Sequence, residues 1–122
     1  MKPTLYIIIR SDVPDMNPGK GMAQASHVTN DFMANCSSPY IREWMEDRNF
    51  GTVLVLSGTI DDIIAITGMD SDTGITIDDT YPWRNWYGKL HLTKEITGGW
   101  AFVHHESTKA LTDYLQTLTL HE

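Results

Sequence analysis

Four polar residues in the first third of the chain stand at a spacing that would let them act together. They are, in order, Lys20, Gln24, His27 and Asp31. Their separations of four, three and four residues place them on one face of a helix. The stripe begins at the Pro18-Gly19-Lys20-Gly21 turn, where free backbone N–H groups and a lysine together favour an anion, either a phosphate or a developing oxyanion. The spacing of a nucleotide-binding P-loop is absent from this turn.

A second set of reactive side chains lies between residues 78 and 89. Asp78 and Asp79 supply carboxylates, which can orient or deprotonate a water molecule. Alternate residues of a strand face opposite sides, so if the strand extends this far only one of this pair can point at Lys20. The residue types leave open which of the two it is.

The segment that follows mixes aromatic and basic residues. Its aromatic residues are Tyr81, Trp83, Trp86 and Tyr87, and its basic ones are Arg84, Lys89, His91 and Lys94. This mixture suits stacking on unpaired bases while the cations meet phosphates. The alternative is a hairpin or β-extension whose aromatic rings pack on one another.

Composition limits the classes of function that are open to the chain. The formal net charge is −7, and residues 51–79 contain six acidic residues and no basic one, which argues against broad nonspecific nucleic-acid binding. Cys36 is the only cysteine, so an intramolecular disulfide and a thiol-ligated metal are excluded. The histidines, His91, His104-His105 and His121, do not meet a metal-ligand spacing either. We expect neither a metal nor an organic cofactor.

The elements that must position these residues alternate along the 122 residues, which we expect to form one domain over residues 1–122. The predicted strands are Leu5–Arg10, Thr52–Leu56, Ile75–Ile77 and Trp100–Val103. The predicted helices are 19–35, 40–48, 60–66 and a last one that opens at Glu106-Ser107-Thr108 and continues to Leu118. The order β-α-α-β-α-β-β-α predicts an α/β fold, with a four-stranded mixed sheet and helices packed on both faces.

The first helix also carries an apolar pattern at helical spacing. Met22, Ala25 or Ser26, Thr29, and Phe32 or Met33 are the residues expected to face the core. The longest apolar run, Leu5–Ile9, is far shorter than the roughly 20 residues of a membrane span. The first four residues run directly into the first strand and leave no room for a secretory signal, so we expect a cytoplasmic protein that does not engage a membrane.

The first strand, loop and helix carry a recognisable signature. Arg10-Ser11-Asp12 is followed by a short loop and then by Gly19-Lys20-x-x-Ala23-Gln24-x-Ser26-His27. This stretch of about 20 residues resembles the signature of the small peptidyl-tRNA hydrolases of the archaeal and eukaryotic type. The resemblance implies hydrolysis of the ester between a peptidyl group and the 3' end of tRNA, which recycles the tRNA. It also implies tRNA as the partner, a homodimer and no cofactor.

The resemblance assigns roles to particular residues. Lys20 becomes the electrophile or phosphate anchor, and Asp78 or Asp79 takes the place of the family's carboxylate. The residues that it implies for substrate binding are Arg10, Gln24, His27, Thr80, Arg84 and Lys89.

Two departures from the family pattern support a second hypothesis. The Gly-Arg-Thr that should follow the aspartate is absent, and residues 52–56 contain no lysine, although many members carry one in this strand. The second hypothesis is a catalytically weakened member of the family that acts as a tRNA- or protein-binding module.

Overall fold

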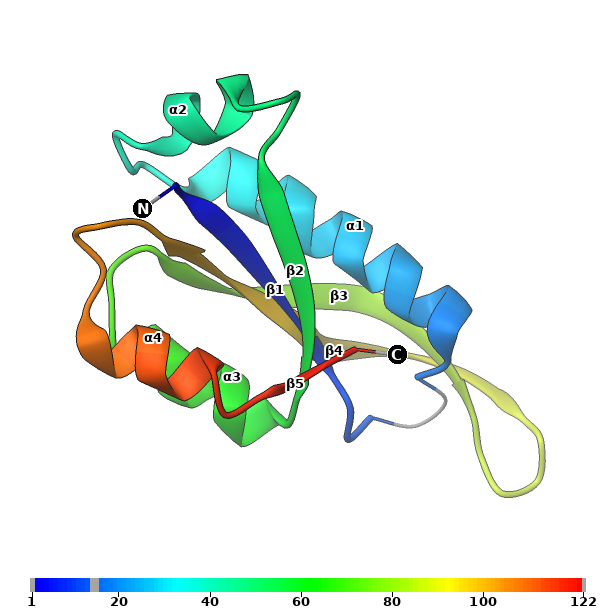
Figure 1. The fold of residues 1–122 in the computed structure, drawn as a ribbon. Coiled ribbons are helices and arrows are strands. Elements are labelled where there is room, and N and C mark those ends of the chain that lie inside the picture. Colours follow the sequence, from blue (N-terminus) through cyan, green and yellow to red (C-terminus); the bar gives the residue numbers. More distant parts are fainter. Residues whose placement is uncertain (1, 14–15, 122) are drawn as a thin grey trace.

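The structure is a computed structural model that describes residues 2–13 and 16–121 (Figure 1). Residues 14 and 15 of the expected loop before the first helix lie outside the described residues. The strands are β1 Thr4–Arg10, β2 Thr52–Gly58, β3 Thr73–Arg84, β4 Leu90–Val103 and β5 Thr119–Leu120. The helices are α1 Pro18–Asn35, α2 Ile41–Glu46, α3 Ile60–Thr67 and α4 Lys109–Leu115. The α/β class is therefore confirmed.

The sheet has five strands in the order β3-β4-β1-β2-β5. β1 runs parallel to β2, and the other neighbouring pairs are antiparallel, so the sheet is mixed as expected. The prediction of four strands was wrong, because the last helix ends at Leu115 and the chain then adds β5 beside β2. A strand of two residues has no alternation of apolar and polar positions that a sequence pattern could reveal.

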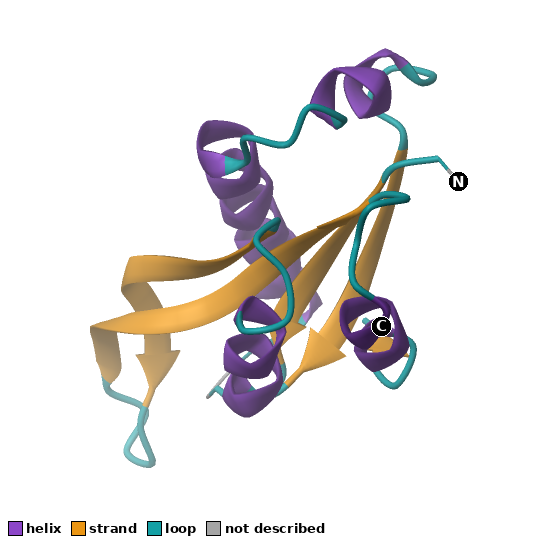
Figure 2. Ribbon diagram, turned by 90° about the vertical axis from the view of Figure 1, so that its left-hand side faces the viewer, coloured by secondary structure: helices purple, strands orange, loops and turns teal. Residues whose placement is uncertain are grey.

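Helices cover both faces of the sheet, as Figures 1 and 2 show. Successive β1 side chains point to opposite faces, and they feed two separate apolar cores. Leu5, Ile7 and Ile9 pack with residues of α1 and α2, whereas Ile8 packs with residues of α3 and α4. A central strand that is apolar on both sides follows from this double cover.

α1 buries only part of the face that its apolar residues predict: Phe32 lies in the core and Ala25 packs against it, as expected. Its buried residues are Gly21, Gln24, Val28 and Phe32. Met22, expected in the core, is 74% exposed, and Met33 is also exposed. The prediction was wrong for Met22, and the buried side of the helix also includes Gln24, whose amide makes hydrogen bonds inside the protein. This correction moves Gln24 from the surface into the centre of the candidate site.

The C-terminal strand brings a histidine to the start of α1. The His121 N–H donates to the Val55 carbonyl, and its Nδ1 lies 2.9 Å from Ser57 Oγ. A Cβ on Gly21 would lie 2.7 Å from His121 Nε2. Gly21 therefore allows the imidazole that follows β5 to pack directly against the first turn of α1.

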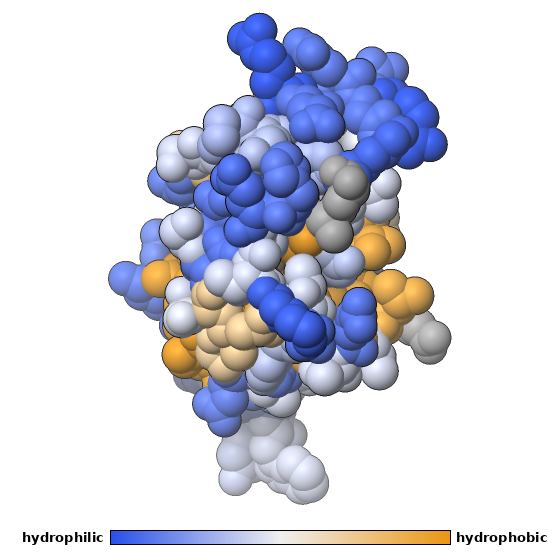
Figure 3. Space-filling model, turned by 60° about the vertical axis from the view of Figure 1, so that its left-hand side comes forward, coloured by the Kyte–Doolittle hydropathy of each residue, from blue (hydrophilic) through white to orange (hydrophobic). Residues whose placement is uncertain are grey.

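Among the described residues, no helix is long and apolar enough to cross a membrane. On the face drawn in Figure 3, hydrophilic residues predominate and hydrophobic ones form smaller, separate patches.

Candidate functional site

The candidate site lies along the line where α1 crosses β3 and β4. β3 contains a bulge between Asp78 and Tyr81, because these residues pair with Glu95 and Thr93 and so leave one extra residue on β3. In a regular strand, positions 78 and 81 would face opposite sides of the sheet. The bulge turns both toward α1: Asp78 contacts Gln24, and the buried ring of Tyr81 lies near Lys20. Bulges of this kind often re-aim side chains beside functional sites.

A buried glutamine joins the helix to both strands. Gln24 is only 3% exposed; its Nε2 donates to Asp78 Oδ2 over 2.9 Å. Its Oε1 accepts a hydrogen bond of 2.6 Å from the hydroxyl of Thr97, a fully buried residue. Thr97 sits at an irregularity of β4, between residues that pair with Thr76 and Ile77. Both polar ends of the amide are thus satisfied, and Asp78 is held in one orientation.

Asp78 is an ionised carboxylate with several donors around it. Burial raises its pKa, but hydrogen bonds from Gln24 and Thr80 and the positive charge of His27 outweigh that effect. The pKa of Asp78 therefore lies below its ordinary value. The Thr80 N–H donates to Oδ1 over 3.0 Å. Three hydrogen bonds, one from Gln24 and two from Thr80, leave about one of the four lone-pair positions of the carboxylate open to a proton of a water or a hydroxyl group.

The structure separates the two aspartates that the sequence could not. Asp78 reaches α1 through Gln24, whereas Asp79 is exposed. Asp78 lines a hollow of about 360 Å³. The hollow is also lined by three exposed residues, Asp79, Thr80 and His27. His27 therefore faces the carboxylate side of the site and does not line the hollow that contains Lys20.

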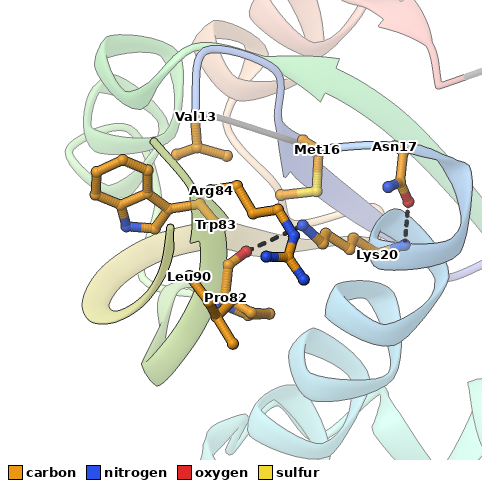
Figure 4. Close-up of a pocket in the computed structure, with 8 residues that line it drawn as sticks. All are labelled: Val13, Met16, Asn17, Lys20, Pro82, Trp83, Arg84 and Leu90. Atoms are coloured by element: carbon orange, nitrogen blue, oxygen red, sulfur yellow. Dashed lines mark hydrogen bonds between the residues drawn. The ribbon is translucent and has the colours of Figure 1, made fainter. Parts of the chain in front are cut away.

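Lys20 lines a second, larger hollow of about 670 Å³ between the first turn of α1 and the β3–β4 hairpin (Figure 4). The other lining residues are Val13, Met16, Asn17, Pro82, Trp83, Arg84 and Leu90. Lys20 Nζ donates to the Pro82 carbonyl over 3.0 Å and lies 5.8 Å from the centre of the Tyr81 ring. Within residues 2–13 and 16–121 Lys20 forms no ion pair with Asp78 or Asp79. The Gln24–Asp78 contact stands between the two hollows along α1.

The first turn of α1 is less free to hold an anion than the sequence suggested. Asn17 is the N-cap, and its side chain accepts the Lys20 N–H over 2.9 Å. The Gly21 N–H donates to the Asn17 carbonyl. Because these two N–H groups already have acceptors, the expectation that they are open to an oxyanion was wrong. The group of α1 that can still bind an anion in this hollow is the ammonium group of Lys20.

Arg10 lies outside the two hollows. Its guanidinium bonds Asp12 over 2.7 Å and Glu95 over 3.3 Å, and it also donates to the Ile96 carbonyl. Two carboxylates neutralise its charge, and its side chain is largely covered. The contacts of Arg10 fix the end of β1 against β4, which is a structural role.

The aromatic and basic segment after Asp79 is a β-hairpin in which β3 and β4 continue beyond the sheet (Figures 1 and 2). Within the hairpin Trp83 stacks on His91, with ring centres 4.7 Å apart, and its indole N–H donates to the Thr93 hydroxyl. This part matches the alternative in which aromatic rings pack on one another. Arg84 lines the larger hollow and donates to the Gly88 carbonyl, while Lys89 is exposed near the tip.

Four contacts of the site were not predicted from the sequence. Thr97 and the Pro82 carbonyl were not singled out, and Asp31 accepts hydrogen bonds from the Thr76 hydroxyl and the Trp100 indole. One signal was the helical spacing of Asp31 with Lys20, and another was the Gly98-Gly99 pair that follows Thr97, whereas a backbone carbonyl leaves no trace in a residue pattern.

Comparison with known proteins does not place the chain in a family. The sequence matches no known family model and no curated protein. Across residues 2–13 and 16–121, no three histidine, cysteine or acidic side chains cluster in a way that could hold a metal ion.

Proposed function

We propose that this protein is a peptidyl-tRNA hydrolase, which cleaves the ester between a peptidyl group and the 3' end of tRNA. The observation that carries the proposal is the buried Gln24, which ties the Asp78 carboxylate to the helix that also presents Lys20. Gln24 and Asp78 are 54 positions apart in the sequence, and the fold brings them into contact. The resemblance assigns Lys20 and Gln24 of α1 and Asp78 of β3 to one site, and the Gln24–Asp78 hydrogen bond joins that helix to that strand.

Ester hydrolysis needs a positioned water molecule and a cation for the oxyanion. Asp78, with its lowered pKa, is a weak base, so its role is to orient the attacking water through a free lone pair. Lys20 would stabilise the negative charge of the tetrahedral intermediate. For that it must exchange its hydrogen bond to the Pro82 carbonyl for one to the substrate.

The proposal is tested by following ester cleavage of N-acetyl-aminoacyl-tRNA by the purified protein. We expect Lys20→Ala and Asp78→Asn each to reduce kcat/KM by about 10²-fold or more, the typical effect of removing a group that acts on the transition state. Lys109→Ala, which changes a lysine on α4, and Asp79→Asn serve as matched controls and should stay within a few-fold of the unaltered protein. Full activity in Lys20→Ala would remove this mechanism.

A second function, a binding module for tRNA without cleavage, is favoured by one specific observation. The Lys20 ammonium group already has a carbonyl acceptor and no carboxylate partner among the described residues. Retained tRNA binding without cleavage above the uncatalysed rate would identify this function and reject the hydrolase.

A further inference from the structure

The β3–β4 hairpin ends in a tip of five residues, Asn85 to Lys89, that projects away from the sheet (Figures 1 and 2). The two strands pair up to Arg84 and Leu90, directly before and after it. The strand residues next to the tip, among them Arg84 and Leu90, line the larger hollow with Lys20. The tip therefore lies next to the candidate site in the chain but outside the folded core.

The tip is held in one conformation by its own hydrogen bonds. Asn85 Oδ1 accepts from the N–H groups of Tyr87 and Lys89, and the Asn85 carbonyl accepts from Gly88. Gly88 has a φ of 77°, which glycine adopts without strain at the end of such a turn. Arg84 closes the turn through the Gly88 carbonyl. The backbone is thus ordered before any partner binds.

This ordered turn presents two aromatic rings to solvent. Trp86 is 93% exposed and Tyr87 is 89% exposed, whereas Trp83 and His91 lower in the hairpin stack on each other. The rings at the tip therefore contribute little to the stability of the fold. Large apolar surface held out in this way is characteristic of a contact surface for a partner.

The charge near the tip is opposite to that of the rest of the chain. Residues 80–94 contain Arg84, Lys89 and Lys94 and no carboxylate. Because the whole chain carries −7, the remaining residues carry −10. A polyanion is attracted to the hairpin and repelled by the rest of the surface. Flat aromatic faces beside cations match unpaired nucleotides, whose bases stack and whose phosphates are negative.

We infer that Trp86 and Tyr87 stack on unpaired nucleotides of a single-stranded RNA end, while Arg84 and Lys89 contact its phosphates. This inference rests on the proposed function, because it assigns the hairpin tip to the unpaired acceptor end of the tRNA substrate. The acceptor end then runs from the tip along the larger hollow toward Lys20. The tip acts as a positioning element and takes no part in the chemistry.

The test is a fluorescence-anisotropy titration of the full chain with a labelled RNA of about ten unpaired nucleotides ending in CCA. Trp86→Ala and Tyr87→Ala should each weaken binding by about 5- to 150-fold, the effect expected for loss of one stacked base. Trp86→Phe keeps a ring and should recover most of the affinity. Both positions are exposed, so all variants should unfold at the same temperature as the unaltered protein.

Two controls identify the kind of partner. A blunt RNA duplex offers phosphates but no unpaired bases, and a poly-glutamate peptide offers negative charge without rings. We expect both to bind more weakly than the single strand and to be insensitive to Trp86→Ala. Unchanged affinity of the Trp86→Ala/Tyr87→Ala double variant for the single strand, or tighter binding of the peptide, would overturn the inference.

The same variants separate this inference from the proposed function. Anisotropy needs no ester cleavage, so ring-dependent RNA binding by a protein that cleaves nothing would leave the inference standing and reject the hydrolase. If cleavage occurs, the double variant should raise KM at unchanged kcat, whereas Lys20→Ala should lower kcat. A double variant that loses kcat at unchanged KM would contradict a positioning role.

Discussion

Replacing the buried Gln24 by glutamate would test the geometry of the candidate site directly. The two side chains have the same shape, and the new carboxylate could still accept the hydrogen bond from Thr97. The donor to Asp78 would be replaced by a second carboxylate oxygen about 2.9 Å away. We expect a loss of stability that grows as the pH rises.

The size of that loss depends on whether the introduced glutamate and Asp78 both stay ionised and repel each other or whether the pair takes up one proton. Two charges at 2.9 Å in an effective dielectric of about 20 repel by about 6 kcal/mol. An ordinary glutamate has a pKa of about 4.3, so holding one proton on the pair costs about 4 kcal/mol at pH 7 and about 1 kcal/mol at pH 5. Proton uptake is the cheaper route, and we therefore expect Gln24→Glu to lose about 3–4 kcal/mol at pH 7 and about 1 kcal/mol at pH 5.

The direction of the effect follows from linkage. In the folded variant the pKa of the carboxylate pair is raised above its unfolded value, so stability is fully present below the unfolded pKa and is lost as the pH rises through the folded one. Urea unfolding at pH 5 and pH 7, followed by circular dichroism, measures the difference.

The control for this test is Asn30→Asp, which makes the same charge change at an exposed position of α1 and should stay within about 0.5 kcal/mol. A difference between Gln24→Glu and the unaltered protein that is equal at both pH values would refute the buried Gln24–Asp78 contact.

Two further changes probe the packing behind the site. Tyr114→Phe should lower the free energy of unfolding by about 1 kcal/mol at neutral pH, because it removes the hydrogen bond that the Tyr114 hydroxyl donates to Asp62. This hydrogen bond contributes most, and those from Thr59 contribute next, to holding the pKa of the Asp62 carboxyl below its ordinary value. Since the folded pKa is lowered, the gap in unfolding free energy should close as the pH falls through it, and a gap constant down to pH 2 would contradict this. Gly98→Ala should cost about 1–3 kcal/mol, because the added Cβ would lie 2.8 Å from the carbonyl oxygen of Ile8. Gly68→Ala, which meets only a contact of 3.6 Å, is its control, and thermal melts of both compare them.

The parts of the fold that the sequence predicted are those with strong patterns. The apolar run that forms β1 and the capped α3 lie where expected, because a central strand and a capped helix each leave a local signature. The Thr59 hydroxyl accepts the Asp62 N–H, and the Asp62 side chain accepts the Thr59 N–H, which completes a capping box. In α1 the prediction was right for Phe32 and wrong for Met22, which is exposed, whereas Gln24 is buried because its amide is hydrogen-bonded.

The parts of the site that could not be predicted depend on backbone irregularity. The choice between Asp78 and Asp79 depends on which residues of β3 face α1. Side chains alternate between the two faces of a regular strand, but the bulge after Asp78 interrupts this alternation, so that both Asp78 and Tyr81 face α1. Thr97 reaches Gln24 from a corresponding irregularity of β4. Neither extra residue is itself a glycine or a proline, and the Gly98-Gly99 pair that follows Thr97 is the local signal of the irregularity in β4.

These irregularities explain why the site and the hairpin depend on each other. Without the bulge after Asp78, Tyr81 would face away from α1, and Lys20 would lose the ring and the Pro82 carbonyl that place its ammonium group. The same shift in β3 sets the direction in which the two strands leave the sheet, because a bulge bends the bulged strand and increases its twist. One extra residue therefore aims both the groups that hold Lys20 and the hairpin that carries the exposed rings. A change that restored regular pairing of β3 with β4 would disturb both the contacts of Lys20 and the direction of the hairpin. A side-chain substitution at only one of these places would disturb only that place.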